Sequence, residues 1–255
     1  MGSEDRFGYE WGKYSALEPD YESQFRLWVA PLTQEDFRGK KVLDVGCGMG
    51  RNSYWCLKWG AEKVVSFDYD NRSVSSARRN LSVFKEKVDV LFKSIYKTEW
   101  KDEFDIVMCI GVLHHLDAPI KAIDNLIRAA KPGGKIIIWV YSYEGNEMVV
   151  RFVNPLRIHI TSKLPLRLVH GLSYVFSIPI WLLTRMYGRA NPYMKQLSNF
   201  SFWHIHSIVF DQLIPRIANY WSKEEVMELF RNKNIEELSI SRSAHGRGWT
   251  IIARK

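Results

Sequence analysis

The sequence predicts an α/β protein built on a doubly wound, mostly parallel sheet. From about residue 40, short apolar segments rich in Val and Ile alternate with amphipathic segments of helical length. Alternation of this kind places helices on both faces of a parallel sheet. The first apolar segment also runs directly into a glycine-rich turn, and the second ends in an acidic residue, Asp68. Because ligands of such sheets bind where the strands end, both features point to that edge.

The expected elements follow from the positions of the apolar segments. Strands are expected near residues 41–46, 63–68, 87–92, 104–109 and 134–141. Helices are expected near residues 51–59, 72–84 and 118–130, with Asn52 or Ser53 capping the first, and an earlier helix is expected from its cap Asp20 to Val29. The alternation then fails for about seventy residues. It resumes at Ser222, where Glu225 completes a capping-box pattern, and two short strands near 235–241 and 247–254 follow.

The turn after the first strand carries Gly46, Gly48 and Gly50 at alternate positions. Glycine tolerates positive φ and lets the backbone approach a ligand closely. Asp68 lies at the spacing of a carboxylate that binds ribose hydroxyls. Together these features predict a nucleotide-like ligand. The residues after Gly48 are Met49, Gly50 and Arg51, which departs from the spacing of NAD-binding turns and disfavours hydride transfer.

On these residues the chain resembles the class I S-adenosylmethionine-dependent methyltransferases, in a subgroup of the methyltransferase-domain 11 or 25 type. The resemblance covers residues 40–141. Residues 104–109 and 111–116 match the family's fourth strand and its loop, and residues 131–141 match the turn and the fifth strand. It implies a Rossmann-like seven-stranded sheet in the order 3-2-1-4-5-7-6 with one antiparallel strand. It also implies S-adenosylmethionine as cofactor and S-adenosylhomocysteine as product.

The resemblance carries over a set of cofactor contacts. It implies that Asp68 accepts both ribose hydroxyls, that Asp44 holds the amino group through the glycine turn, and that Tyr69 or Asp70 flanks the adenine. Ser94 stands where the family often has an acid for the adenine amine, so a weaker acceptor replaces a carboxylate. The complete implied set is Asp44, Gly46, Gly48, Gly50, Arg51, Asp68, Tyr69, Ser94, Ile95 and Ile110.

Methyl transfer from a sulfonium is an in-line displacement in which the protein positions donor and acceptor and removes a proton. The candidates for proton removal are His114, His206 and Asp211. His114 follows the fourth strand and is either the base or part of the pocket wall, while Asp211 is either catalytic or a salt-bridge partner. The candidate acceptor contacts are Trp11, His115, Tyr141, Glu144, Asn146 and His204.

His204 and His206 raise a separate question about metal binding. On a strand, alternate residues face the same way, so the two histidines could be two ligands of one ion. No carboxylate or cysteine nearby completes a set. We therefore expect no metal, and favour a polar wall of the acceptor pocket.

Composition and spacing predict three regions. Residues 1–39 form an N-terminal arm and helix, which either packs on the core or covers the cofactor site. Residues 40–144 and 222–255 form the methyltransferase core, and residues 145–221 form a helical insertion over the acceptor side. The three cysteines have no paired spacing, which fits a reducing compartment. The N-terminus lacks an apolar signal segment, so we expect a cytoplasmic protein.

The insertion carries most of the net charge of +8. Residues 155–221 contain seven Lys and Arg residues against one acid, Asp211, which favours phosphate, a carboxylate or an anionic surface as partner. Residues 168–184 are uncharged between Arg167 and Arg185. This run is shorter than the ~20 residues that span a bilayer and includes Gly171 and Pro179. It is either an interfacial helix pair at the membrane or a packed lid or dimer face.

The leading interpretation is O- or C-methylation of a small molecule that is amphiphilic, lipid-linked or sugar-derived. A nucleic acid is the less favoured acceptor, because the basic residues lie beside apolar runs rather than in a separate module; strong salt-dependent affinity for tRNA would favour an RNA methyltransferase instead. A third alternative is a non-catalytic cofactor-binding subunit, which undetectable cofactor binding would support. A homodimer is compatible with the apolar insertion.

Overall fold

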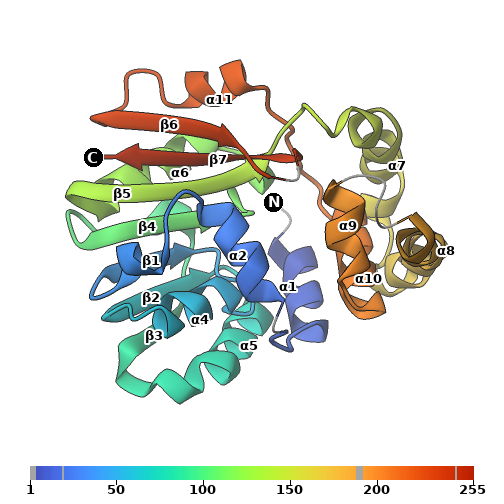
Figure 1. The fold of residues 1–255 in the computed structure, drawn as a ribbon, viewed down its shortest axis with the longest axis horizontal. Coiled ribbons are helices and arrows are strands. Elements are labelled where there is room, and N and C mark those ends of the chain that lie inside the picture. Colours follow the sequence, from blue (N-terminus) through green and yellow to red (C-terminus); the bar gives the residue numbers. More distant parts are fainter. Residues whose placement is uncertain (1–3, 19, 188–191, 245) are drawn as a thin grey trace.

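The computed structural model describes residues 4–18, 20–187, 192–244 and 246–255. A seven-stranded sheet with the order β3-β2-β1-β4-β5-β7-β6 forms its centre (Figure 1). All neighbouring strands are parallel except β7, which is antiparallel to β5 and β6. This confirms the predicted fold class and strand order. The strands are Lys41–Val45 (β1), Lys63–Asp68 (β2), Val88–Phe92 (β3), Phe104–Ile110 (β4), Ala130–Tyr141 (β5), Glu237–Arg242 (β6) and Gly248–Arg254 (β7).

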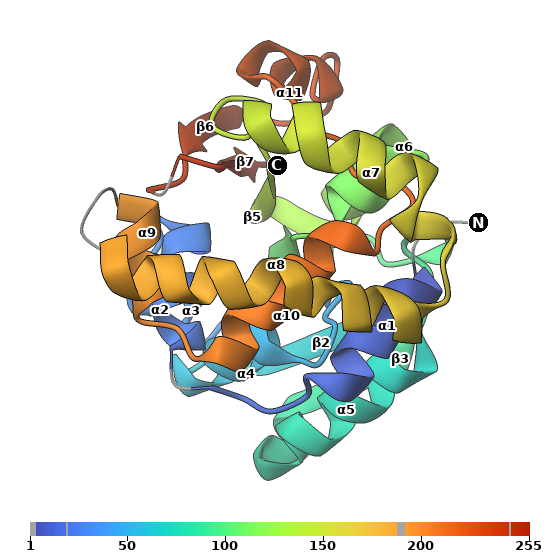
Figure 2. The ribbon, with the colours of Figure 1, turned by 90° about the vertical axis from the view of Figure 1, so that its right-hand side faces the viewer.

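Helices cover both faces of the sheet and one of its ends (Figures 1 and 2). Short 3-10 turns occur at Ser82–Lys87, Ile95–Lys97, Leu113–His115 and Thr161–Lys163, and a π-helical turn at Val149–Val153. The α-helices are Glu4–Lys13 (α1), Tyr21–Val29 (α2), Gln34–Phe37 (α3), Arg51–Lys58 (α4), Asn71–Leu81 (α5), Pro119–Ala129 (α6), Asn154–His159 (α7), Leu166–Tyr187 (α8), Pro192–Ser198 (α9), Phe202–Leu213 (α10) and Lys223–Leu229 (α11).

The central strands are apolar on both sides because each face of the sheet is covered. On one face, side chains of α2, α4 and α5 pack against β1 and β4. On the other face, α6 and α11 pack against the alternate residues of the same strands. A strand buried on both faces reads as a continuous apolar run, which is why the alternation was visible in the sequence. The parallel register brings Val45, Asp68 and Ile110 to the same edge.

Two helix starts differ from the sequence-based expectation. Asp20 precedes α2 but its side chain makes no capping hydrogen bond. The residue before α4 is Gly50, at φ +86°, and neither Asn52 nor Ser53 caps that helix. A left-handed glycine turns the chain directly into α4, so Ser53 lies inside the helix, and its hydroxyl instead donates to Asp44. The predicted capping box of Ser222 and Glu225 at α11 is present.

The segment 145–221 is helical and lies beyond the strand ends. Residues 168–184, which suggested a helix pair, belong to one continuous helix, α8, that includes both Gly171 and Pro179. Pro179 lies on the exposed side, where solvent satisfies the carbonyl that loses its helical bond. Figure 2 shows α8 crossing the outside of the molecule with α10 beneath it. Within the described residues, α8 is the one helix that is long and apolar enough to cross a membrane, judged by length and composition alone.

Candidate active site

A cavity of about 320 Å³ lies at the carboxyl ends of β1, β2, β4 and β5. Three parts of the chain line it: α1 and α2, the strand ends and loops of the core, and the segment from the π-helical turn to α10. Its volume falls within the range of roughly 300–1,000 Å³ that small-molecule sites have. Fourteen predicted site residues line it: Trp11, Gly46, Gly48, Arg51, Asp68, Tyr69, Ser94, Ile95, Ile110, His115, Tyr141, Asn146, His204 and Asp211.

The glycine turn forms the floor of the cavity because the chain folds back sharply after β1. The amides of Gly46 and Cys47 both donate to the Phe67 carbonyl of β2, at 2.9 and 3.0 Å. Gly48 has φ +54°, and a Cβ at this position would lie 3.0 Å from the indole nitrogen of Trp11. Only glycine allows this backbone conformation together with this close approach. Trp11 of α1 therefore covers the turn directly.

Asp68 ends β2 beside this turn. One carboxylate oxygen accepts the Gly48 amide at 2.9 Å, and the other accepts the Asp70 amide at 3.1 Å. Burial raises the pKa of Asp68 to about 6, although these two hydrogen bonds oppose the shift. A carboxylate has about four acceptor positions, so two remain for a ligand. Two adjacent hydroxyls, as on a ribose, match what remains.

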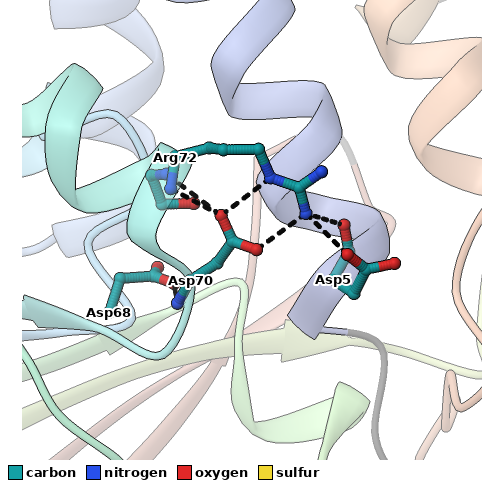
Figure 3. A network of polar contacts seen from close by, with 5 residues as sticks. Asp5, Asp68, Asp70 and Arg72 are labelled. Atoms are coloured by element: carbon teal, nitrogen blue, oxygen red, sulfur yellow. Dashed lines mark hydrogen bonds and ion pairs between the residues drawn. The ribbon is translucent and has the colours of Figure 1, made fainter.

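The N-terminal helix is held against the core by an ion-pair network (Figure 3). The carboxylate of Asp70 caps α5 by accepting the amide of Arg72 at 2.8 Å, and it also pairs with the Arg72 guanidinium at 2.7 Å. The same guanidinium reaches Asp5 of α1 at 2.8 Å. A Cβ at Gly8 would overlap the Asp70 carboxyl group, at 1.9 Å. The close approach of α1 therefore depends on this glycine, and the contacts keep α1 over the cavity.

Arg51 introduces the positive charge of the cavity. Its guanidinium lies 4.8 Å from the ring centre of Trp28, 5.2 Å from Trp11 and 5.3 Å from Tyr21. It also donates to the side-chain oxygen of Gln24 at 3.3 Å. Aromatic faces attract the cation without neutralising it. Arg51 therefore keeps its charge available beside the glycine turn.

A chain of hydrogen bonds forms the opposite wall and fixes Asp211. The Tyr220 hydroxyl donates to the Gln212 carbonyl oxygen at 2.9 Å, and the Gln212 amide donates to the Tyr141 hydroxyl at 3.0 Å. The Tyr141 hydroxyl then donates to Asp211 at 2.9 Å. Burial raises the pKa of Asp211 to about 6, while the bond from Tyr141 works in the opposite direction. A proton acceptor with a pKa near neutrality is thus held in a defined orientation.

Comparisons with known proteins agree with this geometry. The family described as "Methyltransferase domain" matches residues 43–138, from β1 into β5, including the glycine turn and Asp68. Residues 43–138 of this chain therefore form a methyltransferase domain. Solved structures share this fold along nearly the whole chain. A SAM-dependent methyltransferase from Aquifex aeolicus has a TM-score of 0.55 and 18% identity, with 97% of each chain covered.

Curated relatives of this methyltransferase have different names. The tRNA U34 carboxymethyltransferase of Campylobacter hominis is 27% identical over 147 residues, which are 55% of this chain and 51% of that protein. The ubiquinone biosynthesis O-methyltransferase of Thiobacillus denitrificans is 34% identical over 135 residues, which are 51% of this chain and 55% of that protein. The chain therefore spans about half the length of these curated relatives.

Two histidines predicted as candidate bases lie away from the cavity. The His114 side chain is completely buried, and neither ring nitrogen has a partner among the described residues. Its ring packs 3.9 Å from that of Tyr141, and burial lowers its pKa well below the usual range. His206 lies between α8 and α10, with Nδ1 2.7 Å from the Ser177 hydroxyl. His204 and His206 are on a helix, where residues two apart do not face the same way, so the strand premise behind a metal pair was wrong.

Three other predicted residues also lie outside the cavity wall. Asp44 accepts the Ser53 hydroxyl at 2.5 Å behind the glycine turn, so it supports the turn rather than a ligand. Gly50 packs against α5, where an added Cβ would lie 2.9 Å from Leu81. Glu144 is half-buried in the loop after β5 and does not line the cavity.

Among the residues that do line the cavity, two histidines are neutral parts of the wall. Nδ1 of His115 lies 2.7 Å from the Ile217 carbonyl, to which it donates, so Nε2 carries no proton. Burial lowers the pKa of His115 to about 3, and burial beside Arg51 does the same for His204. Asn146 is committed to the loop, because its amide donates to the carbonyls of Ser142 and Arg247.

The sequence analysis missed Glu10. This residue of α1 is 1% exposed and lines the cavity, and its Oε2 has no hydrogen-bond partner among the described residues. Burial and the charge of Asp211 raise the pKa of Glu10 well above its usual range. The sequence could have indicated Glu10, because it is an acidic residue between Tyr9 and Trp11 in a segment that was expected to pack through its aromatic residues.

Proposed function

We propose that this methyltransferase transfers the methyl group of S-adenosylmethionine to an oxygen atom of an amphiphilic small molecule in the cytoplasm. One observation carries the proposal. Asp211 of the segment 145–221 faces the same cavity as Asp68 and the glycine turn of the core. A site for the methyl donor and a group that removes a proton therefore share one enclosed space.

The core residues fit the cofactor. Asp68 has free acceptor positions for the two ribose hydroxyls, and the charge of Arg51 beside the glycine turn suits the methionine carboxylate. Ser94 and Tyr69 line the same end of the cavity and flank the position left for the adenine. When bound, the cofactor supplies a methyl group on a sulfonium, which is a good leaving group.

The residues of the opposite wall supply the proton chemistry. At neutral pH Asp211 is largely ionised, because its pKa of about 6 lies below the ambient pH. It accepts the proton of an acceptor hydroxyl while the new carbon–oxygen bond forms and the carbon–sulfur bond breaks. Burial and the charge of Asp211 raise the pKa of Glu10, which favours its protonated form next to an ionised Asp211. The charge of Arg51 in the same cavity limits the cost of burying the Asp211 carboxylate.

An acceptor with an apolar body suits the remaining wall. Aromatic and aliphatic side chains from six elements or loops line this part of the cavity: Phe7, Trp139, Val149, Leu197, Phe200 and Ile208. A hydroxyl-bearing aromatic or prenylated compound would bury its body here and present its oxygen to Asp211. Relatives named for ubiquinone biosynthesis O-methylation support this acceptor class.

RNA is the second candidate acceptor, because other relatives are named tRNA U34 carboxymethyltransferases. The concave, mainly apolar wall of the cavity favours a small molecule over a polynucleotide. The net charge of +8 keeps the alternative open to test.

The test follows a labelled methyl group from S-adenosylmethionine into a host-cell extract, which is then separated into organic, small aqueous, RNA and protein fractions. We expect label in the organic fraction with the wild-type chain, and none with Asp211→Asn. Label in the RNA fraction would replace the small-molecule proposal by the second candidate. No label in any fraction, with S-adenosylhomocysteine binding intact, would indicate a non-catalytic cofactor-binding subunit.

A further inference from the structure

The polarity of α8 is inverted relative to an ordinary surface helix. Its side toward the protein carries His170, Ser173, Ser177 and Thr184, together with Val169. Its outer side is apolar, and Val175 and Met186 are 66% and 71% exposed. We call these outer residues the apolar face of α8: Leu168, Leu172, Val175, Phe176, Ile178, Leu182, Leu183 and Met186. In water, a helix turns its apolar side inward, so this helix is built for a different neighbour.

Inward polar side chains of α8 form hydrogen bonds to α10 and to Tyr14, which makes the orientation of α8 specific. The Ser177 hydroxyl donates to the Ser173 carbonyl at 2.8 Å and lies 2.7 Å from Nδ1 of His206 on α10. His170 lies 2.8 Å from the Tyr14 hydroxyl. A rotation of α8 that buried its apolar face would break the two hydrogen bonds that leave the helix, to His206 and to Tyr14. Buried polar groups without partners are costly, so the helix is held with its apolar side outward.

The positively charged residues around the apolar face of α8 indicate which kind of surface it contacts. Residues 148–210 contain seven Lys and Arg residues and neither Asp nor Glu. Arg151, Lys163, Arg167 and Arg185 are exposed around α7 and α8, whereas Arg189 lies outside the described residues. An apolar helix face with cations at its edges matches an interface of acyl chains below anionic headgroups. A second copy of this chain would bring two positive faces together, which disfavours self-association.

We propose that α8 docks on an anionic membrane surface, with its apolar face in the acyl boundary and the flanking Lys and Arg residues at the headgroups. The helix lies in the surface rather than across the bilayer, because its polar side is bonded to α10 and α1. Figures 1 and 2 place α7 beside α8, at the end of the molecule beyond the strand ends. Exposed Phe152, Ile158 and Ile160 add apolar surface there.

Exposed apolar surface near α7 borders the cavity wall in the chain. Met148 is exposed, while its neighbour Val149 lines the cavity wall. On the inner side, α10 packs beneath α8 and contributes His204, Ser207 and Asp211 to the cavity. An amphiphile in the leaflet that α8 contacts would thus reach Asp211 without crossing water. This last step rests on the proposed function, whereas the docking itself does not.

The test measures sedimentation of the full chain with vesicles of phosphatidylcholine, and with vesicles of an equal mixture of phosphatidylcholine and phosphatidylglycerol. We expect binding to the mixed vesicles that weakens with salt. Replacing two residues of the apolar face, Val175→Glu with Leu182→Glu, removes buried area and adds negative charge. This variant should lower the affinity for the mixed vesicles at least tenfold. The double variant Lys163→Glu with Arg167→Glu should lower that affinity by about threefold to tenfold.

Matched controls replace exposed residues on the core. Val83→Glu is the apolar control at 69% exposure, and Lys87→Glu is the charge control. Both should bind vesicles as the wild type does. The proposal would be overturned if the wild type did not bind vesicles, or if the control variants lost as much vesicle affinity as the apolar-face variant. It would also be overturned if the only effect of the apolar-face variant were to convert a dimer into a monomer. Calorimetric titration should show that every variant still binds S-adenosylhomocysteine. A variant that binds S-adenosylhomocysteine but not vesicles has lost docking alone, with its cofactor site intact.

Discussion

Helices α6 and α8 both lie against the protein on one side, yet they divide their residues in opposite ways. α6 buries Ala122, Ile123 and Leu126 against the sheet and exposes Lys121 and Asp124. α8 buries serines, a threonine and a histidine and exposes leucine, valine and phenylalanine. The first pattern is what water imposes on a surface helix. The pattern of α8 indicates that its outer side is suited to contact a surface other than water.

The largest expected effect is the difference in unfolding free energy between a variant with a new Asp on α6 and one with a new Asp on α8. Ile123→Asp buries a carboxylate without a partner in the core, which costs several kcal/mol, so we expect the chain to be unfolded or to lose about 4 kcal/mol or more of unfolding free energy. Val175→Asp adds the charge where the side chain is already exposed, and should change that free energy by about 0.5 kcal/mol or less. Urea unfolding followed by circular dichroism measures both. Equal destabilisation would refute the contrast between the two helices.

The next effect separates the roles of the insertion and the core in the reaction. Asp211→Asn removes the proton acceptor and should lower kcat by about 10²- to 10⁴-fold. Because Asp211 acts when ionised, kcat/KM of the wild type should be high above its pKa of about 6 and fall as pH drops through that value. The measurement is a pH–rate profile with the acceptor found in the organic fraction. A full rate for Asp211→Asn would remove this residue as base.

Asp68→Ala should give the complementary result. It deletes the carboxylate that we propose to accept the two ribose hydroxyls, so the affinity for S-adenosylhomocysteine should fall at least about tenfold. Asp211→Asn, its control across the cavity, should bind S-adenosylhomocysteine as the wild type does. Calorimetric titration of both variants tests the division of labour. Unchanged binding by Asp68→Ala would place the cofactor elsewhere.

The smallest effect concerns the inward side of α8. Ser177→Ala leaves Nδ1 of His206 without its partner and should cost about 1–2 kcal/mol of unfolding free energy. Leu183→Ala on the apolar face should cost less than about 0.5 kcal/mol in water, because that side chain is exposed already. Thermal unfolding of the two variants in vesicle-free buffer measures this. A greater loss in Leu183→Ala would mean that the face is covered within the protein.

The sequence predicted the core well because strands and turns depend on residue types at neighbouring positions in the chain. The glycines of the turn, Asp68 at the end of β2 and the apolar strands all have short-range patterns, and the structure has each of them in place. It predicted the insertion less well. The proline and glycine in residues 168–184 suggested an interruption, but a proline on the exposed side of a long helix is tolerated.

The assignment of catalytic residues shows the same limit. His114 follows the fourth strand in sequence, but its side chain turns behind Tyr141 rather than into the cavity. Glu10 lies far from every motif, yet α1 brings it opposite Asp211. Which way a side chain points, and which distant residues share a cavity, depends on packing between elements, and packing leaves little trace in a single sequence.

By itself the sequence determined the apolar strands, the glycine turn and the place of Asp68 at the end of β2, because these depend on residue types at fixed spacings; the strand order came from the family resemblance. Only the tertiary structure decided the rest of the site. It joined Glu10, Tyr141 and Asp211 across the cavity, set His114 and His206 aside, and turned the polar side of α8 inward. Those outcomes depend on contacts between different elements, from Ser177 with His206, 29 positions apart, to Tyr141 with Asp211, 70 positions apart, and burial and hydrogen bonding in the whole fold decide them.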